Sequence, residues 1–233
     1  MTHEVVVEAT DLARTYVQDE SEIHALRGVN MTVSRGEFVA VTGPSGSGKS
    51  TLLHLLGGLD RPDHGAITIE GQSLAELDEE GLSVLRRRRL GFVLQFFNLL
   101  PTLSATENVA FPLMLDGRAD AVPRALAALE RVGLAGRGRH RPGQLSGGEQ
   151  QRVAIARAMV TEPAVVLADE PTGSLDSLMG EDILRLLREV ADADQAVVMI
   201  THEPRSAAYA DRVIRLRDGA VIQPAMDEAG ADL

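Results

Sequence analysis

The chain has 233 residues, of which 44% are hydrophobic, so it can bury a substantial core in one large domain or two small ones. Its formal net charge of −11 argues against broad nucleic-acid binding, which usually requires a basic surface. Because the chain contains no cysteine, disulfides and thiolate metal sites are excluded.

The first residues, MTHEVVVEATDLAR, lack the basic segment and the apolar segment of a secretory signal. The longest apolar runs, such as 164–168 and 196–200, are far shorter than the roughly 20 residues of a membrane-spanning helix. We therefore expect a soluble, cytoplasmic protein. The acidic residues 226–233 are expected to form a loose C-terminal tail.

Short β-branched segments alternate with helix-like segments, which predicts an α/β fold with a largely parallel sheet. In chain order, strands are expected at 5–8, 37–42, 66–70, 91–94, 165–169 and 197–201, the first and third of them in a smaller β portion. Helices are expected at 104–115, 121–132 and 147–160, with 136–143 as a connecting loop. The block from about 97 to 160 therefore predicts an inserted helical subdomain.

A glycine-rich segment, GPSGSGKS at 43–50, follows the strand EFVAVT and precedes the helix-forming TLLHLLGGL. It fits the phosphate-binding pattern G-x-x-x-x-G-K-[ST] in the required strand and helix context. Gly43, Gly46 and Gly48 allow successive N–H groups to point at phosphate oxygens, next to the positive end of the following helix. A flexible glycine turn without function is the alternative.

Lys49 is the only lysine in the chain, beside 22 arginines. Its compact ammonium is expected to contact the β- and γ-phosphates, where a wide guanidinium would not fit in the same way. The Ser50 hydroxyl is a suitable oxygen ligand for Mg²⁺. A single lysine also excludes the guanine-reading N-K-x-D pattern of the commonest GTPases.

The segment AVVLADE at 164–170 reads as a buried strand that ends in two carboxylates. Asp169 is expected to hold Mg²⁺ through water, and Glu170 to orient and polarise the attacking water. Burying two adjacent acids is costly without a cation nearby. A solvated strand end is the alternative.

The segment LSGGEQ at 145–150 contains Ser146 and Glu149 at the spacing of a capping box, which predicts a helix start there. Ser104 and Glu107 have the same spacing. A helix start with two glycines also exposes N–H groups that could bind a second anion. Such a second site implies either two anions or two subunits that share each nucleotide.

This ordered set of motifs, from about residue 5 to 222, resembles the nucleotide-binding ATPase subunit of ATP-binding cassette (ABC) transporters. The resemblance implies an α/β P-loop NTPase core with an inserted helical subdomain and a small antiparallel β subdomain, in a single ABC ATPase domain over 1–225. It also implies ATP and Mg²⁺ as cofactors, and a homodimer that encloses ATP between two copies.

Further site residues follow from the resemblance alone. It implies that Gln95, in GFVLQFFN, senses Mg²⁺ and water, and that His202 is a switch histidine at the γ-phosphate. Tyr16 stands where the family places an aromatic ring against adenine, although core packing is an alternative for this residue. The nucleotide-binding set is Gly43, Pro44, Ser45, Gly46, Ser47, Gly48, Lys49, Ser50 and Thr51, with Ser146, Gly147, Gly148, Glu149 and Asp176 acting across the dimer.

Within the family, GGLDRPDHGAITIEGQSL and LADEPTGSLD resemble the MacB and LolD subgroup, with FtsE nearby. This implies an integral membrane permease partner, peripheral attachment to the inner face of the cell membrane, and efflux, lipoprotein release or mechanical signalling as the work powered. A soluble, non-transport ABC ATPase is the alternative. The arginine run 86–89 could be a docking patch or simply a solvated helix end.

Overall fold

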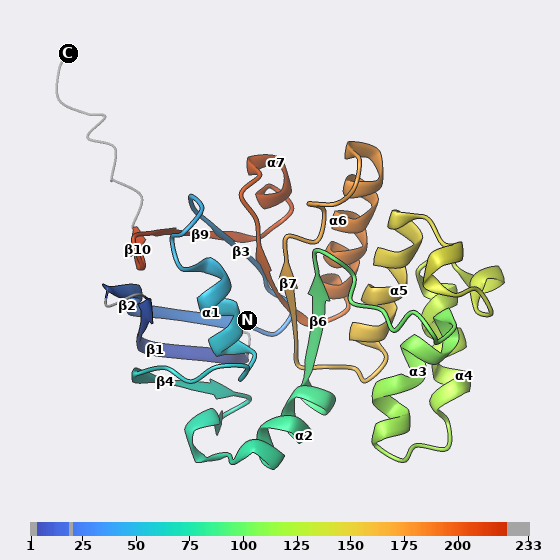
Figure 1. Cartoon of the computed structure of the whole chain (residues 1–233), viewed down its shortest axis with the longest axis horizontal. Helices are drawn as coiled ribbons and strands as arrows, with labels where there is room; N and C mark the ends of the chain where they lie inside the picture. Colours follow the sequence, from blue (N-terminus) through green and yellow to red (C-terminus); the bar gives the residue numbers. More distant parts are fainter. Residues whose placement is uncertain (1–3, 19–20, 223–233) are drawn as a thin grey trace.

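The computed structural model describes residues 4–18 and 21–222, and the expected tail at 226–233 lies outside the described residues. The described residues form two β-sheets with helices between and around them (Figure 1). The larger sheet has six strands in the order β10-β9-β3-β8-β7-β6, and the smaller has four in the order β2-β1-β4-β5.

The elements have the following bounds. The strands are β1 Val5–Gln18, β2 Ser21–Ser34, β3 Phe38–Thr42, β4 His64–Ile69, β5 Gln72–Ser73, β6 Leu90–Leu94, β7 Val165–Asp169, β8 Ala196–Ile200, β9 Arg212–Arg217 and β10 Ala220–Ile222. The helices are α1 Lys49–Leu56, α2 Glu79–Arg89, α3 Ala105–Leu115, α4 Ala121–Arg131, α5 Gly147–Met159, α6 Ser177–Asp192 and α7 Pro204–Ala207. Short 3₁₀ turns span Leu74–Glu76, Ala135–Arg137 and Pro142–Gln144.

The pairing of the strands confirms the expected fold class. Strands β3, β6, β7, β8 and β9 run parallel to their neighbours, and only β10 pairs antiparallel at the edge of the larger sheet. The smaller sheet is antiparallel throughout. The chain is thus an α/β protein with a separate antiparallel β portion.

Two hydrophobic cores lie on opposite faces of the larger sheet. Successive side chains of a strand point to opposite faces, so Val39 and Val41 of β3 join the core shared with α1 and the smaller sheet. Phe38 and Ala40 join the core shared with α3, α5 and α6. Because both faces are covered, the central strands read as continuous apolar runs.

The smaller sheet is more extensive than the sequence predicts. Strand β1 continues to Gln18 instead of ending at residue 8, because it pairs with β2 along its length. Strand β2 has no counterpart among the predicted strands. Its first four residues are exposed and its buried positions begin only at Leu26, so the alternation that identifies a strand is absent from its first half.

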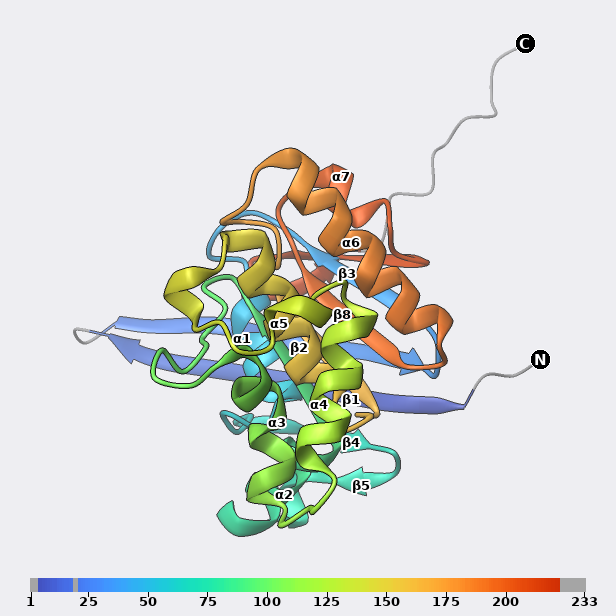
Figure 2. The same cartoon turned by 90° about the vertical axis from the view of Figure 1, so that its right-hand side faces the viewer.

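Helices α3, α4 and α5 occur within one residue of the predicted bounds, and they form one flank of the molecule (Figures 1 and 2). The expected loop at 136–143 differs in that it contains parts of two 3₁₀ turns. Among the described residues, none of the helices has the length and apolar character required to traverse a bilayer.

Three of the four arginines at the end of α2 are held by carboxylates, whereas Arg86 donates to the backbone oxygen of Gly58. Asp116, at the C-terminal end of α3, accepts hydrogen bonds from Arg87 and Arg88, each at 2.9 Å. Arg89 pairs with Glu70, in the turn between β4 and β5. The run therefore connects α2 to the helical flank and to the smaller sheet.

Substitution of Glu70 tests these connections. Glu70 also accepts a hydrogen bond from Arg35 at 3.1 Å. Burial alone would raise the pKa of Glu70, but Arg89 and Arg35 together lower it. Its stabilising contribution is therefore complete above the unfolded pKa of about 4.3 and is lost as the pH falls through the lower folded value. Glu70→Gln should reduce the free energy of unfolding by about 1–2 kcal/mol at neutral pH.

Chemical denaturation at neutral pH and near pH 4 measures this effect. The matched control is Glu79→Gln, since Glu79 is 79% exposed and its contact with Arg61 is 3.4 Å long. This control should change stability very little. A Glu70→Gln penalty that did not shrink on acidification would contradict the assignment.

Candidate functional site

The glycine-rich segment forms the loop between β3 and α1, as expected. Its last glycine, Gly48, has φ +100°, and a Cβ there would lie 2.2 Å from the backbone oxygen of Ala25 in β2. A side chain at this position is excluded by both the backbone conformation and the space. The close approach fixes the loop against the smaller sheet.

Lys49 is the first residue of α1 and is only 8% exposed. Its Nζ donates to the backbone oxygens of Gly43 at 3.0 Å and Pro44 at 2.8 Å. The aliphatic part of the side chain is thus buried, and the ammonium is held against the loop's own carbonyls. This arrangement keeps a positive charge beside the backbone that would surround a phosphate.

The two predicted acids stand at the end of β7. Asp169 is the last strand residue, and burial raises its pKa, with a further rise caused by the neighbouring Glu170 and an opposing effect of His54 and Lys49. Glu170 follows in a left-handed conformation with φ +43°. A cation bound beside Asp169 would oppose this rise in its pKa and favour the ionised carboxylate.

His202 follows β8 and meets Glu170. Its Nδ1 lies 2.9 Å from Glu170 Oε1, within hydrogen-bonding distance. Since β7 and β8 are parallel neighbours, their carboxyl ends bring together residues that are 32 positions apart. The alternative of an ordinary strand-end histidine gains no support from this contact.

A cleft of about 610 Å³ collects most of the predicted phosphate-side residues. Its lining is Tyr16, Ile23, Ala25, Ser45, Gly46, Gly48, Lys49, Ser50, Thr51, Glu170 and His202. The lining combines backbone N–H groups of a glycine loop, hydroxyls, one ammonium and one carboxylate–histidine pair. These groups suit a nucleoside triphosphate.

The fit for Mg²⁺ rests on oxygen donors. Ser50 lines the cleft beside Lys49, and Asp169, which is outside that lining, lies at the end of β7 close enough to Lys49 to feel its charge. Within residues 4–18 and 21–222, no group of three or more His, Cys, Asp or Glu side chains could hold a metal alone. Mg²⁺ commonly uses one or two protein ligands with phosphates and water, and Ser50 and Asp169 carry oxygen donors of that kind.

Gln95 lies just after β6 and outside the lining of the cleft. Its backbone oxygen accepts a hydrogen bond from Ser174 Oγ at 2.8 Å. Its side chain packs against Gly173, where a Cβ would come within 2.8 Å of Gln95 Nε2. Gln95 is therefore in contact with the segment that connects Glu170 to α6.

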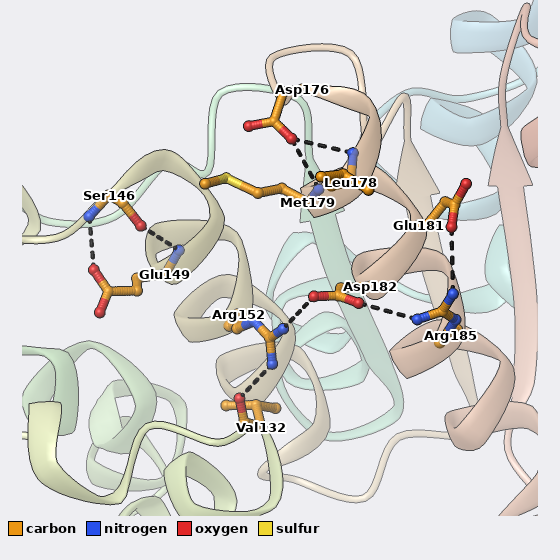
Figure 3. Close-up of polar contacts among 10 residues, drawn as sticks. All are labelled: Val132, Ser146, Glu149, Arg152, Asp176, Leu178, Met179, Glu181, Asp182 and Arg185. Carbon is orange, nitrogen blue, oxygen red and sulfur yellow. Dashed lines mark hydrogen bonds and ion pairs between the residues drawn. The ribbon is translucent and has the colours of Figure 1, made fainter.

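LSGGEQ forms the predicted capping box at the start of α5. Ser146 N donates to Glu149 Oε2 at 2.8 Å, and Glu149 N donates to Ser146 Oγ at 3.2 Å (Figure 3). Ser146, Gly147 and Gly148 do not line the cleft with the glycine-rich loop. In one chain, this second candidate anion site is thus separate from the first.

Asp176 caps the neighbouring helix, α6. Its Oδ1 accepts hydrogen bonds from the backbone N–H groups of Leu178 at 3.1 Å and Met179 at 3.0 Å (Figure 3). The Met179 side chain lies against Gly148, since a Cβ there would be 3.0 Å from the methionine sulfur. A Cβ at Gly147 would likewise lie 3.4 Å from Leu175 Cδ2, so the LSGGEQ segment and residues 174–176 lie side by side.

Tyr16 lines the cleft from β1 and is not among the buried core residues. Its hydroxyl donates to Asp60 Oδ2 at 2.8 Å, and Arg14 lies over its ring. Sequence reasoning missed Arg14 and Asp60 as neighbours of the site. The only available signal was the LDRPDHG segment, which carries Asp60 close behind α1.

Comparisons with known proteins agree with these features. A family model described as ABC transporter matches residues 26–173. The chain is 48% identical over 228 residues to the macrolide export ATP-binding/permease protein MacB of Hyphomonas neptunium, covering 97% of this chain and 35% of that protein. It is 49% identical to the lipoprotein-releasing system ATP-binding protein LolD of Chromohalobacter salexigens, covering 96% of this chain and 95% of that protein.

A solved structure agrees as well. A dimeric ATP-binding cassette in a post-hydrolysis state, bound to ADP and Pi, superposes with a TM-score of 0.85. It is 43% identical, and the match covers 93% of this chain and 97% of that chain. The chain thus spans only about a third of the MacB relative but nearly all of LolD and of this cassette.

Replacing Lys49 by arginine tests whether charge alone is sufficient at this position. Lys49→Arg should fold, because the charge and most of the apolar stem are kept, but ATP affinity should fall by about tenfold or more because the guanidinium is wider. Calorimetric titration with ATP measures this. Arg185→Lys, at a surface arginine whose side chain is 61% exposed, is the control and should bind normally. Unchanged affinity in Lys49→Arg would overturn this account.

Proposed function

This chain belongs to the ABC transporter family, and from that premise we propose that it binds ATP with Mg²⁺ and hydrolyses it as the nucleotide-binding subunit of a transporter. The cleft in which Lys49, Ser50, Glu170 and His202 meet carries the proposal. A phosphate-binding loop, an oxygen ligand for Mg²⁺ and a carboxylate–histidine pair face the same space.

Each residue has a distinct role in the proposed reaction. Lys49 contacts the β- and γ-phosphates, while Ser50, Asp169 and Gln95 serve Mg²⁺, which neutralises phosphate charge when bound. Glu170 orients the attacking water and accepts a proton from it as a general base. His202, whose Nδ1 is 2.9 Å from Glu170 Oε1, orients that carboxylate, and we propose that it also contacts the γ-phosphate.

Two copies of the chain are proposed to form one ATP-hydrolysing unit. Ser146, Gly147 and Gly148, at the start of α5, lie outside the cleft lining of their own chain, and we infer that this helix start contacts the γ-phosphate held by a second copy. Glu149 shapes this helix start, and Asp176 lies beside it at the same surface. A two-fold axis would then complete both sites.

The unit is proposed to power a separate integral membrane permease and to lie at the inner face of the cell membrane through it. The names of the relatives support this, since MacB combines ATP-binding and permease parts and LolD belongs to a lipoprotein-releasing system. A soluble, non-transport ABC ATPase is the second candidate. Co-purification with a multi-pass membrane protein separates the two.

We also propose that residues 1–225 form a single ABC ATPase domain. Helices α3, α4 and α5 lie between β6 and β7, two adjacent strands of one sheet, which supports a helical subdomain inserted at about 97–160. Cores on both faces of that sheet support one folding unit.

Replacing Glu170 by glutamine tests the reaction and the dimer together. Glu170→Gln should keep the shape of the cleft but slow hydrolysis by about 10²-fold or more, because glutamine cannot accept the proton of the attacking water. ATP should then persist and favour the dimer by mass action. Size-exclusion chromatography with light scattering should detect a dimer with ATP and a monomer with ADP.

A second substitution locates the contact. Ser146→Arg in the Glu170→Gln protein should abolish the dimer while sparing nucleotide binding by the monomer. Ser104→Arg is the matched control, since Ser104 and Glu107 form the same capping box at the start of α3. A dimer equally stable with ADP would contradict the proposal that the γ-phosphate of ATP holds the two copies together.

A further inference from the structure

The ring of Tyr16 is fixed by two side chains, Asp60 from the loop that follows α1 and Arg14 from its own strand. Its hydroxyl donates to Asp60 Oδ2 at 2.8 Å, and the Asp60 residue stands in the loop that follows α1. The guanidinium carbon of Arg14 lies 4.9 Å from the ring centroid. This is within the range of a cation–π contact. One end and one side of the ring are therefore held.

Arg14 is itself held firmly. Its Nε and Nη2 donate to the two oxygens of Asp60 at 3.0 and 2.9 Å, and its Nη1 donates to Asp63 at 2.6 Å. This forked geometry is one that arginine can form and lysine cannot. The Thr15 backbone N–H donates to the other oxygen of Asp63 at 2.6 Å. The loop after α1 is thus tied to β1 at several points.

The charges agree with this geometry. Burial alone would raise the pKa of Asp60, but hydrogen bonds from Tyr16 and the Arg61 N–H, together with Arg14, leave it below its ordinary value. The pKa of Asp63 is likewise lowered, chiefly by the Thr15 N–H and Arg14. Both carboxylates therefore stay ionised at neutral pH and keep Arg14 in place.

We infer that Arg14 and Asp60 are positioning residues for the base of the bound nucleotide, because together they hold the Tyr16 ring at the wall of the cleft. The inference rests on the proposed function. Arg14 covers part of the ring, and Asp60 engages its hydroxyl, so the remaining ring surface is held ready for stacking. Tyr16, Ile23 and Ala25 form the part of the cleft wall beyond the glycine-rich loop.

The phosphates and the base of the nucleotide are expected to contact different parts of the cleft, so their binding can be tested separately. The glycine-rich loop and Lys49 would hold the phosphates, whereas Arg14 acts only through Tyr16. Loss of Arg14 should therefore weaken the binding of ATP but not that of inorganic triphosphate, which has no base. General damage to the fold would weaken the binding of both.

The experiment compares Arg14→Met with the parent and with Arg61→Met. Arg61 lies next to Asp60 in the same loop, and its side chain is directed to Leu77 and Glu79, so its removal makes the same change of charge without touching Tyr16. Calorimetric titrations with Mg²⁺-ATP and with Mg²⁺-triphosphate give the affinities. Arg14→Met should weaken ATP binding by roughly three- to tenfold. Arg14→Met should leave the affinity for triphosphate unchanged. Arg61→Met should leave the affinities for both ATP and triphosphate unchanged.

A spectroscopic signal follows the ring directly. The chain has no tryptophan and two tyrosines, so Tyr209→Phe makes Tyr16 the only tyrosine fluorophore. In that background, ATP should quench the fluorescence, triphosphate should not, and Arg14→Met should shift the quenching to higher ATP concentration.

The outcomes are distinct. Equal ATP affinity in Arg14→Met and the parent would overturn the inference, and so would an equal loss of affinity for ATP and triphosphate. Failure of the parent to bind either ligand would overturn the proposed function itself, and this inference with it.

Discussion

The site depends on the alignment of three parallel strands whose carboxyl ends meet at one edge of the larger sheet. Asp169 of β7 pairs with Ile200 of β8, and Ile200 pairs with Val41 of β3. Because side chains on both faces of these strands are buried, a shift of one strand along another would exchange two packed faces. The glycine-rich loop, Glu170 and His202 are thus brought together by core packing, before any ligand contributes.

The sequence predicts those parts of the fold whose signal is local. β7 has the expected bounds and α5 differs by one residue, because a buried apolar run and a capping box are read within a few residues. The second half of β1 and all of β2 were missed although they pair as a local hairpin, because the first half of β2 is exposed and shows no apolar alternation. The setting of Tyr16 was missed for a different reason, since its partner Asp60 is 44 residues away in the sequence.

The contrast between one lysine and 22 arginines acquires a structural meaning. Arg14, Arg35 and Arg152 each connect separate elements through hydrogen bonds to two partners, a geometry that suits a planar fork. Lys49 is enclosed by carbonyls of its own loop, a geometry that suits a compact ammonium. Arginine joins parts of this protein, whereas the one lysine is proposed to contact the phosphates of the ligand.

The parts of this molecule are held together by two kinds of contact, which respond differently to salt. Partly exposed ion pairs connect the helical flank to the smaller sheet through α2. They join Arg87 and Arg88 to Asp116, and Arg89 to Glu70. Such pairs weaken as ions accumulate, since the screening length is about 8 Å at physiological ionic strength and shorter above it. The glycine-rich loop is held by backbone contacts instead. Concentrated salt would therefore loosen the connection between the helical flank and the smaller sheet, while the glycine-rich loop kept its shape.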